Sequence, residues 1–225
     1  MKILGLETSS TLFSVCLNND ARLICEIRKD RDAQHGPRDG DVFREVQGLL
    51  KQLHGEPLGA VVISIGPGMF TSLRVGLSLA KGIAFAQNVP IVGVNTLDII
   101  GMSSLFFNKV LLAVINAFQG EIYAAFYKKG KPISDYMLTT PNKLQALSKK
   151  HRSAAEGTLI AGPGVSALKN IPAGSISYLQ SDFFLPSAAK AVLLALPRIK
   201  KSNFDDPEFL EPFYLKKTDA ERKDG

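Results

Sequence analysis

Two short segments in the first half of the chain carry residue types that could hold a phosphate group. A Gly-Pro-Gly turn at residues 66–68 lies between an apolar run and a long helical pattern, where backbone N–H groups and the positive end of a helix attract anions. A Glu-Thr-Ser sequence at residues 7–9 ends the first apolar run and offers a carboxylate and two hydroxyl groups. A second Gly-Pro-Gly sequence stands at residues 162–164. The first turn is not followed by Gly-Lys-Ser or Gly-Lys-Thr, so it is no P-loop, and a plain strand-to-helix turn is an equally good interpretation.

Residues that could bind a metal or act as nucleophiles are few. His35 has Asp39 four residues further on, but His54 and His151 complete no pair at that spacing. A lone histidine in a polar segment is far more often a surface residue than a ligand. A peptidase would need a nucleophile or a metal with an ordered base, and the sequence holds no complete set. We therefore expect neither a metal site nor catalytic residues.

Composition indicates a globular chain. Of the 225 residues, 45% are hydrophobic and 21% are charged, and no apolar run is long enough to cross a membrane. The N-terminus lacks the apolar stretch of a signal peptide, so we expect a cytoplasmic location. Residues 1–105 hold 10 basic and 10 acidic side chains, so the whole net charge of +6 lies in residues 106–225. We interpret this positive excess as ordinary lysines on a solvated surface. The alternative interpretation is a surface that binds nucleic acid.

The first half shows strand patterns followed by alternating helices and strands. Three short alternating runs joined by tight turns predict antiparallel strands, and a hairpin there would place Cys16 and Cys25 on one face. Residues 29–40 are polar and glycine-rich, which predicts a loop. Apolar runs predict strands that are covered on both faces. The expected strands are 2–7, 11–17, 22–28, 60–65 and 90–94, and the expected helices are 41–53, 71–87 and about 96–106.

The second half repeats this order. We expect strands at 110–116, 121–127, 133–138 and 159–161, a helix that begins at Thr140-Pro141, and a helix at about 186–196. Each half thus begins with antiparallel strands and continues with helices and further strands. This predicts two related α/β lobes, residues 1–105 and 106–225, in the pattern of the actin-like, ribonuclease-H-like kinase and ATPase fold.

The helix at 71–87 is unusual in how much of its circumference is apolar. Arg74, Ser78 and Lys81 fall on one narrow polar stripe, and apolar residues cover about two-thirds of the rest. Such a helix is buried on more than one side, either within its own domain or against a partner. Gly76 and Ala80 would permit another helix to approach closely. The helix at 41–53 is a second candidate for the same surface.

The order of several motifs resembles the TsaB family. Residues 66–77 read G-P-G-M-F-T-S-L-R-V-G-L and residues 80–82 read A-K-G, which is similar to the family signature. Further matches stand at 3–9, 120–124 and 212–216 and cover almost the whole chain. The resemblance implies a two-lobe actin-like α/β fold, each lobe a mixed sheet flanked by helices. It also implies no transferase activity of its own: TsaB proteins pair with the transferase TsaD, which acts with the ATPase TsaE on the tRNA adenosine beside the anticodon.

The resemblance also implies sites and partners. We expect a homodimer when the chain is alone, contact with tRNA only through TsaD, and no required cofactor, with ATP or ADP bound weakly or at the partner interface. A vestigial nucleotide site would comprise Glu7, Thr8, Ser9, Gly66 and Gly68. The TsaD interface would comprise residues of the two helices, namely Val42, Val46, Leu49, Leu50, Leu53, Leu73, Arg74, Leu77, Ala80, Lys81 and Ala84.

The sequence departs from the family in three places. His35 and Asp39 replace the paired histidines that bind metal in TsaD. Asn116 and Phe118 stand where the family often has aspartate and arginine, and residues 30–41 lack the usual loop pattern. Two alternatives therefore stay open. One is an enzyme of the same fold, either a small-molecule kinase or ATPase or a glycoprotease-like peptidase; the other is direct tRNA binding through the basic second half.

Overall fold

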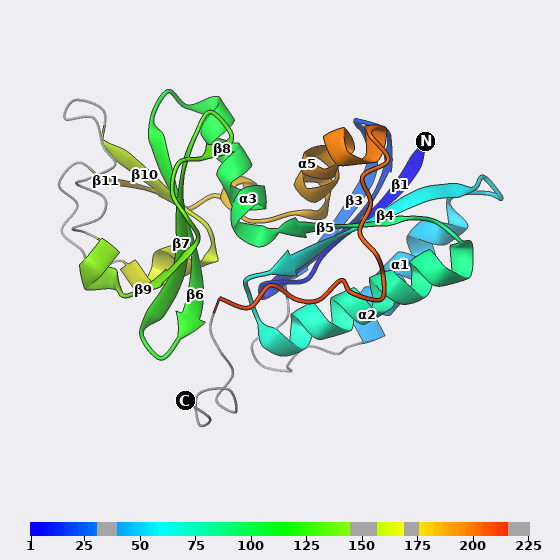
Figure 1. Cartoon of the computed structure of the whole chain (residues 1–225), viewed down its shortest axis with the longest axis horizontal. Helices are drawn as coiled ribbons and strands as arrows, with labels where there is room; N and C mark the ends of the chain where they lie inside the picture. Colours follow the sequence, from blue (N-terminus) through cyan, green and yellow to red (C-terminus); the bar gives the residue numbers. More distant parts are fainter. Residues whose placement is uncertain (31–39, 145–156, 169–175, 216–225) are drawn as a thin grey trace. The chain divides into compact units, whose positions relative to one another are not determined.

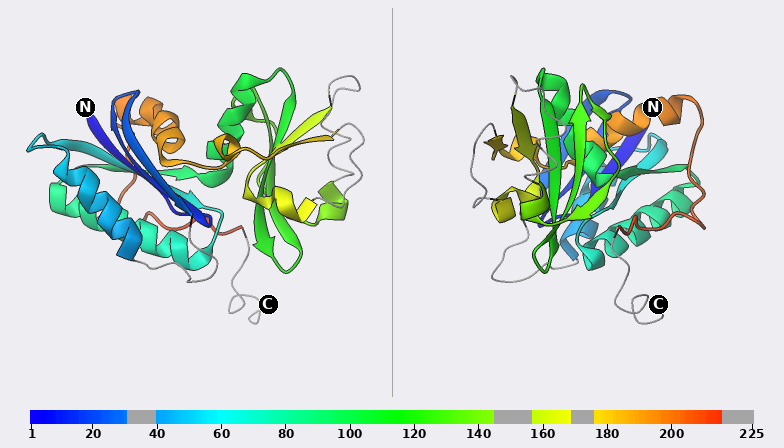
Figure 2. Two further views of the ribbon diagram at one scale, coloured as in Figure 1. Left: turned by 180° about the vertical axis from the view of Figure 1, so that it is seen from behind. Right: turned by 60° about the vertical axis from the view of Figure 1, so that its left-hand side comes forward.

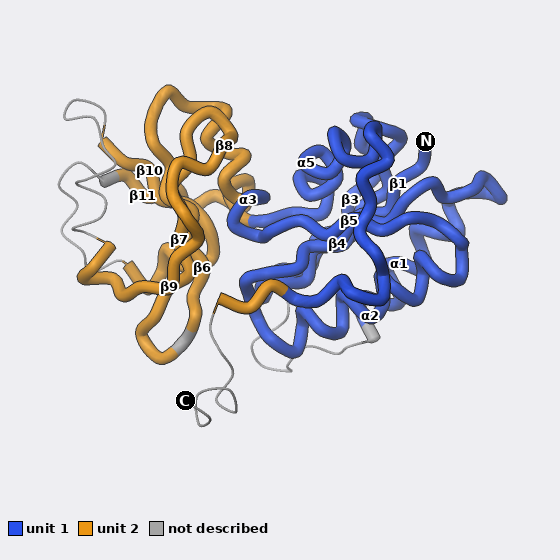
Figure 3. Tube along the Cα trace, in the orientation of Figure 1, with its two compact units in different colours: residues 1–99, 186–212 blue, residues 100–185, 213–225 orange. Residues whose placement is uncertain are grey.

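The computed structural model describes residues 1–30, 40–144, 157–168 and 176–215. The chain forms two compact units (Figure 3). Unit 1 comprises residues 1–99 and 186–212, and unit 2 comprises residues 100–185 and 213–225. The predicted loop at 29–40 falls mostly outside the described residues.

Unit 1 is built on a five-stranded mixed sheet (Figure 1). The strand order is β3-β2-β1-β4-β5, in which the first three strands are antiparallel and β4 and β5 run parallel to β1. The parallel strands are nearly all apolar, as expected for strands covered on both faces. The strands are β1 (Lys2–Glu7), β2 (Leu12–Asn19), β3 (Arg22–Asp30), β4 (Leu58–Gly66) and β5 (Ile91–Asn95).

Helices cover both faces of this sheet. Helices α1 (Gly40–Lys51) and α2 (Phe70–Gln87) pack on one face, and α5 (Ala188–Lys200) packs on the other. Side chains of β4 alternate between the two, with Ile63 towards α1 and α2 and Val62 towards α5. The predicted helices and strands of this region are confirmed, with ends that differ by no more than four residues.

Unit 2 contains a second mixed sheet (Figure 2). Its order is β11-β10-β6-β7-β8, and β9 also pairs with β7. The core on one face combines side chains of β6, β7, β10 and the 3₁₀ helix η2. The elements are α3 (Thr96–Gly101), which crosses the boundary between the units, η1 (Met102–Phe106), β6 (Val110–Phe118), β7 (Glu121–Lys128), β8 (Lys131–Pro132), β9 (Met137–Thr139), β10 (Thr158–Ala161), η2 (Pro163–Leu168), β11 (Ile176–Leu179) and η3 (Asp182–Phe184).

The predicted division of the chain at residues 105 and 106 is corrected by the position of α5. This helix belongs to unit 1, although it follows all the strands of unit 2 in sequence. Its first turn is tied to the unit 1 sheet, because the Ala188 N–H donates to Ser14 Oγ at 2.7 Å and the Ala189 N–H donates to Glu26 Oε1 at 2.9 Å. Its apolar side chains complete the core on that face of the sheet.

Two local predictions were also wrong, and one strand was missed. Of the strand expected at 133–138, only residues 137 and 138 are in a strand, β9. Ser134 Oγ accepts the Phe126 N–H at 2.9 Å and interrupts the pairing between β8 and β9. β11 was not predicted. Cys16 and Cys25 do not share a face, because the register between β2 and β3 shifts at Leu17 and Asn18. Cys16 therefore packs on the α5 side and Cys25 on the α1 side.

Gly5 in β1 sets how closely α5 approaches the sheet. A Cβ atom at this position would lie 2.6 Å from Cys16 Sγ and 2.9 Å from the Ala188 carbonyl oxygen. We predict that Gly5→Ala lowers the free energy of unfolding by about 1–3 kcal/mol, as overpacked cores do. Gly48→Ala in α1 is the control, because nothing lies within 4 Å of a Cβ there and alanine favours a helix by about 0.5–1 kcal/mol. Urea denaturation measures both, and equal stability of the two variants would refute this packing argument.

Candidate functional site: the end of β1 and the outer face of α1 and α2

The expected nucleotide residues lie together in unit 1, where β1 ends. Glu7, Thr8 and Ser9 are each at most 1% exposed. The Glu7 carboxylate turns back along the chain, and its Oε1 accepts the Ser9 N–H at 2.6 Å and the Ser9 hydroxyl at 2.5 Å. The Thr8 N–H donates to Ser64 Oγ of the neighbouring strand β4 at 3.3 Å. The acidic end of β1 is therefore tied to its own sheet.

The Gly-Pro-Gly turn fits tightly over this strand end. The Met69 N–H, which precedes α2, donates to the Ser9 carbonyl oxygen at 2.8 Å. A Cβ on Gly68 would lie 2.3 Å from that same oxygen, so only glycine fits there. Gly66 has a φ of +109°, a backbone conformation that also favours glycine. The two glycines thus serve the turn, as the plain interpretation of this motif predicts.

The contact continues one turn into α2. A Cβ on Gly76 would lie 2.1 Å from Thr8 Oγ1. That hydroxyl is buried, and no hydrogen-bond partner lies within reach of it. The N–H groups of Thr8, Ser9 and Met69 already donate within the protein. A phosphate group at this position would have to displace these bonds, and nucleotide binding here stays a prediction.

Most of the expected partner-interface side chains lie inside unit 1. Because α1 and α2 both rest on the sheet, the wide apolar arc of α2 faces its own core. The assignment is therefore corrected for these residues, which are no more than 7% exposed. They are Val42, Val46, Leu49, Leu53, Leu73, Leu77, Ala80 and Ala84. Of the expected set, Arg74 is exposed, and Leu50 and Lys81 are half-buried.

The outer face of the same two helices carries a different apolar surface. Phe43 is 48% exposed on α1, and Phe85 is 91% exposed on α2. Between the helices lies a groove with a volume of about 380 Å³. We call it the α1–α2 groove; it is lined by Phe43, Leu50, Ser78, Leu79, Gly82, Ile83, Ala86 and Gln87.

Small residues keep this groove open along α2. Nothing lies within 4 Å of a Cβ placed on Gly82, and Ser78 and Ala86 are also exposed. At the start of α2, the Arg74 guanidinium lies 3.9 Å from the centre of the exposed Phe70 ring. Exposed apolar grooves with small residues allow the close approach of a helix from another molecule. Of these three residues, only Ser78 belongs to the polar stripe predicted from the sequence, and helical periodicity alone does not group it with Gly82 and Ala86.

Among the residues that the structure describes, no group of three or more His, Cys, Asp or Glu side chains could hold a metal ion. His35 and Asp39 lie outside those residues. In the same part of the chain, no helix is long and apolar enough to cross a membrane.

The contact between Thr8 and Gly76 can be tested by a double-mutant cycle. We predict that Gly76→Ala lowers the free energy of unfolding by about 1–3 kcal/mol through the clash with the Thr8 side chain. Thr8→Ala removes the two nearest atoms of that side chain, so the double variant should recover part of the loss. Urea denaturation of the three variants gives the coupling energy. Strictly additive effects would show that α2 does not rest on Thr8.

The chain is similar to known proteins of one family. The family model of TsaD, tRNA N6-adenosine threonylcarbamoyltransferase, matches residues 44–223. The tRNA threonylcarbamoyladenosine biosynthesis protein TsaB of Escherichia coli is 24% identical over 231 residues, which cover 99% of this chain and 98% of that protein. TsaB of Bacillus subtilis is 26% identical over 148 residues, which cover 65% of this chain and 63% of that protein.

The solved structure of YeaZ from Pseudomonas aeruginosa has the same fold, with a TM-score of 0.76 at 22% identity. The match covers 95% of this chain and 99% of that structure. A second Pseudomonas aeruginosa structure, described as an uncharacterized protein with similarity to peptidase YEAZ, gives a TM-score of 0.74 at 21% identity over 96% of this chain and 99% of that one. The expected actin-like fold of two mixed sheets flanked by helices is thereby confirmed. With the motifs in family order and a family model over most of its length, the chain belongs to the TsaD-type family and, within it, to the TsaB proteins.

Proposed function

We propose that this chain acts in tRNA threonylcarbamoyladenosine biosynthesis as a non-catalytic subunit that docks a TsaD-type transferase. The proposal extends to this chain the role named in its relatives, which are described as tRNA threonylcarbamoyladenosine biosynthesis proteins. The observation that carries the docking role is the α1–α2 groove, because a monomer gains nothing from exposing Phe43 and Phe85 on one face.

The shape of the groove indicates what kind of surface fills it. A helix can lie against Ser78, Gly82 and Ala86, because their short side chains let its backbone approach closely. The TsaD family model matches residues 44–223, which include α2 and most of α1. A TsaD-type protein is therefore expected to carry an equivalent helix pair, and the two pairs would pack as a bundle.

The end of β1 supports a non-catalytic role. In an enzyme of this fold the strand-end acid and hydroxyls would face the reacting phosphates, whereas Glu7 here accepts both polar hydrogens of Ser9.

Under this proposal any ATP or ADP binds weakly or at the partner interface. The proposal also includes a TsaE-type ATPase that joins the pair, a homodimer of the free chain through the same groove, and action in the cytoplasm.

The docking surface is tested by filling the groove. We predict that Gly82→Leu abolishes copurification with the cognate co-expressed TsaD-type protein, while its urea-denaturation midpoint stays equal to or above that of the wild type. Phe43→Ser should weaken copurification at least tenfold. Leu193→Ser on α5 is the matched control, since Leu193 is 40% exposed on a helix of the opposite face. Normal copurification of Gly82→Leu and Phe43→Ser would contradict the assignment.

The biochemical role is tested in cells and with the purified chain. Deletion of the gene should abolish threonylcarbamoyladenosine in tRNA, as measured by mass spectrometry of nucleosides, and the wild-type gene should restore it. The purified chain alone should not hydrolyse ATP in the presence of Mg²⁺ or cleave a protein substrate. Steady turnover without any partner would favour the enzyme alternative instead.

A further inference from the structure

A group of aromatic side chains, two of them exposed, lies in unit 2, whereas the α1–α2 groove belongs to unit 1. Phe106 at the end of η1 is 65% exposed, and Phe183 in η3 is 47% exposed. Their ring centres are 5.2 Å apart in an edge-to-face arrangement. Phe184 continues the group, with ring centres 5.2 Å from Phe183 and 6.0 Å from Phe107. We call these four residues the phenylalanine cluster.

Four lysines gather at one end of the unit 2 sheet. Lys109 directly precedes β6, and Lys128, Lys129 and Lys131 form the turn from β7 to β8. Because β6 runs antiparallel to β7, with Leu111 opposite Tyr127, the start of β6 and the end of β7 lie at the same end of the sheet. No acidic residue occurs at positions 99–120 or 122–134, so nothing in these segments offsets the positive charge.

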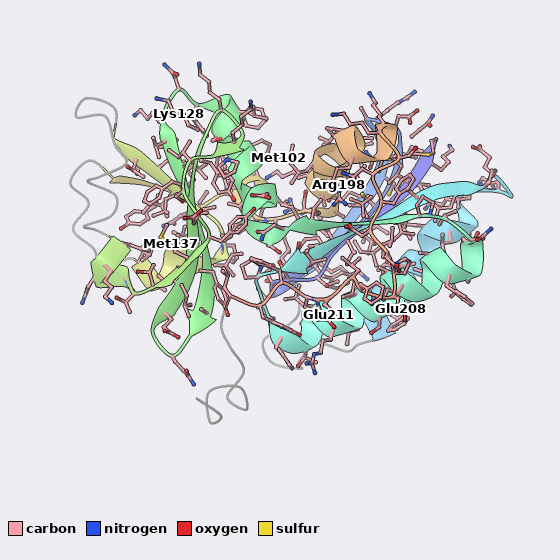
Figure 4. The ribbon with its side chains drawn as sticks, viewed as in Figure 1. Met102, Lys128, Met137, Arg198, Glu208 and Glu211 are labelled. Atoms are coloured by element: carbon pink, nitrogen blue, oxygen red, sulfur yellow. The ribbon has the colours of Figure 1, made fainter. Side chains whose placement is uncertain are left out.

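The turn that holds three of these lysines is fixed against η1. The Gly130 N–H donates to Ser104 Oγ at 2.7 Å, and a Cβ on Gly130 would lie 2.9 Å from Leu105. Leu105 is 60% exposed and directly precedes Phe106. Figure 4 shows Lys128 at this end of unit 2, and Met102, the first residue of η1, marks the helix that leads to Leu105 and Phe106. The lysines and the phenylalanine cluster therefore belong to one surface, in which the contacts between the turn and η1 hold them together.

From this juxtaposition we infer that this end of unit 2 binds single-stranded RNA directly. Exposed aromatic rings stack on unpaired bases, whereas lysine side chains contact the phosphates between them. A paired A-form helix hides the faces of its bases, so unpaired nucleotides fit these rings better. Two nearby acids are Asp182 beside Phe183 and Asp135 after the lysine turn. That this surface binds a single-stranded nucleic acid is inferred from the geometry alone. Only the choice of RNA over DNA rests on the proposed function.

A protein partner fits this surface less well. Protein interfaces are depleted in lysine at their centres, and the burial of several ammonium groups against a protein partner would be costly. A phosphate backbone instead places one negative charge at each nucleotide and releases counterions when lysines bind it. Charge and aromatic exposure together thus favour nucleic acid.

The inference is tested by fluorescence anisotropy with the full chain and a labelled, unstructured RNA of about 12 nucleotides. Phe106→Ala should weaken binding by about 5- to 100-fold, as the loss of one stacking platform does. The double variant Lys129→Gln with Lys131→Gln should weaken it and reduce the slope of log K against log salt by about 1.4. Phe209→Ala and the pair Lys200→Gln with Lys201→Gln are matched controls in unit 1, and they should bind RNA as the wild type does.

Several results would overturn this inference. They are unchanged binding by the Phe106 and lysine variants, equal binding of a duplex of the same length, or self-association that Phe106→Ala abolishes while no RNA binds. Melting temperatures equal to that of the wild type exclude misfolding of a variant. Copurification with the TsaD-type protein should survive Phe106→Ala. Loss of RNA binding with docking intact therefore separates this surface from the α1–α2 groove. The RNA measurement tests only this inference, and the copurification tests only the docking proposal.

Discussion

The close seating of α2 on the end of β1 is the contact on which unit 1 depends. Gly68 lies against the Ser9 carbonyl, and Gly76 lies against the Thr8 side chain, so no larger residue fits at either position. This seating places the first turn of α2 over a strand end where the Glu7 carboxylate accepts the Ser9 N–H and the Thr8 N–H donates to Ser64 Oγ. A motif that could have cradled a phosphate group thereby holds a helix in place. The glycines serve the packing of the turn and helix, and the docking surface that we propose lies on the other side of the helix.

That placement decides which residues of α1 and α2 can meet a partner. With α2 held on the sheet, its Leu77, Ala80 and Ala84 fill the core, and the opposite stripe of Ser78, Gly82 and Ala86 faces outwards. The outer stripe is short-chained and flanked by exposed phenylalanines, so it forms a groove and not a smooth polar surface. Unit 2 presents a surface of another kind, in which lysines accompany the exposed rings. The two proposed surfaces thus differ in chemistry, and each proposal assigns them to a different kind of partner.

Much of the fold could be predicted from the sequence because local patterns determine it. The apolar runs of β4 and β5 and the stripe of α1 are readable from periodicity, and the motif order indicated the family. Three features depended on contacts between distant residues. The extra residue in β3 that separates Cys16 from Cys25 leaves no local sign, and neither does the hydrogen bond from the Phe126 N–H to Ser134 Oγ that divides β8 from β9. Nor does the return of α5 to unit 1, which depends on Ser14 and Glu26 far away in sequence.

The wrong assignment of the interface has the same origin. A wide apolar arc shows that a helix is buried on several sides, but it does not show whether the sheet or a partner covers it. Hydrogen exchange of this chain, alone and with its TsaD-type partner, tests the account most directly. The account predicts added protection of peptides that cover α1 and α2, with no change in those that cover the lysine turn between β7 and β8. Protection confined to unit 2, with α1 and α2 exchanging as in the free chain, would contradict it.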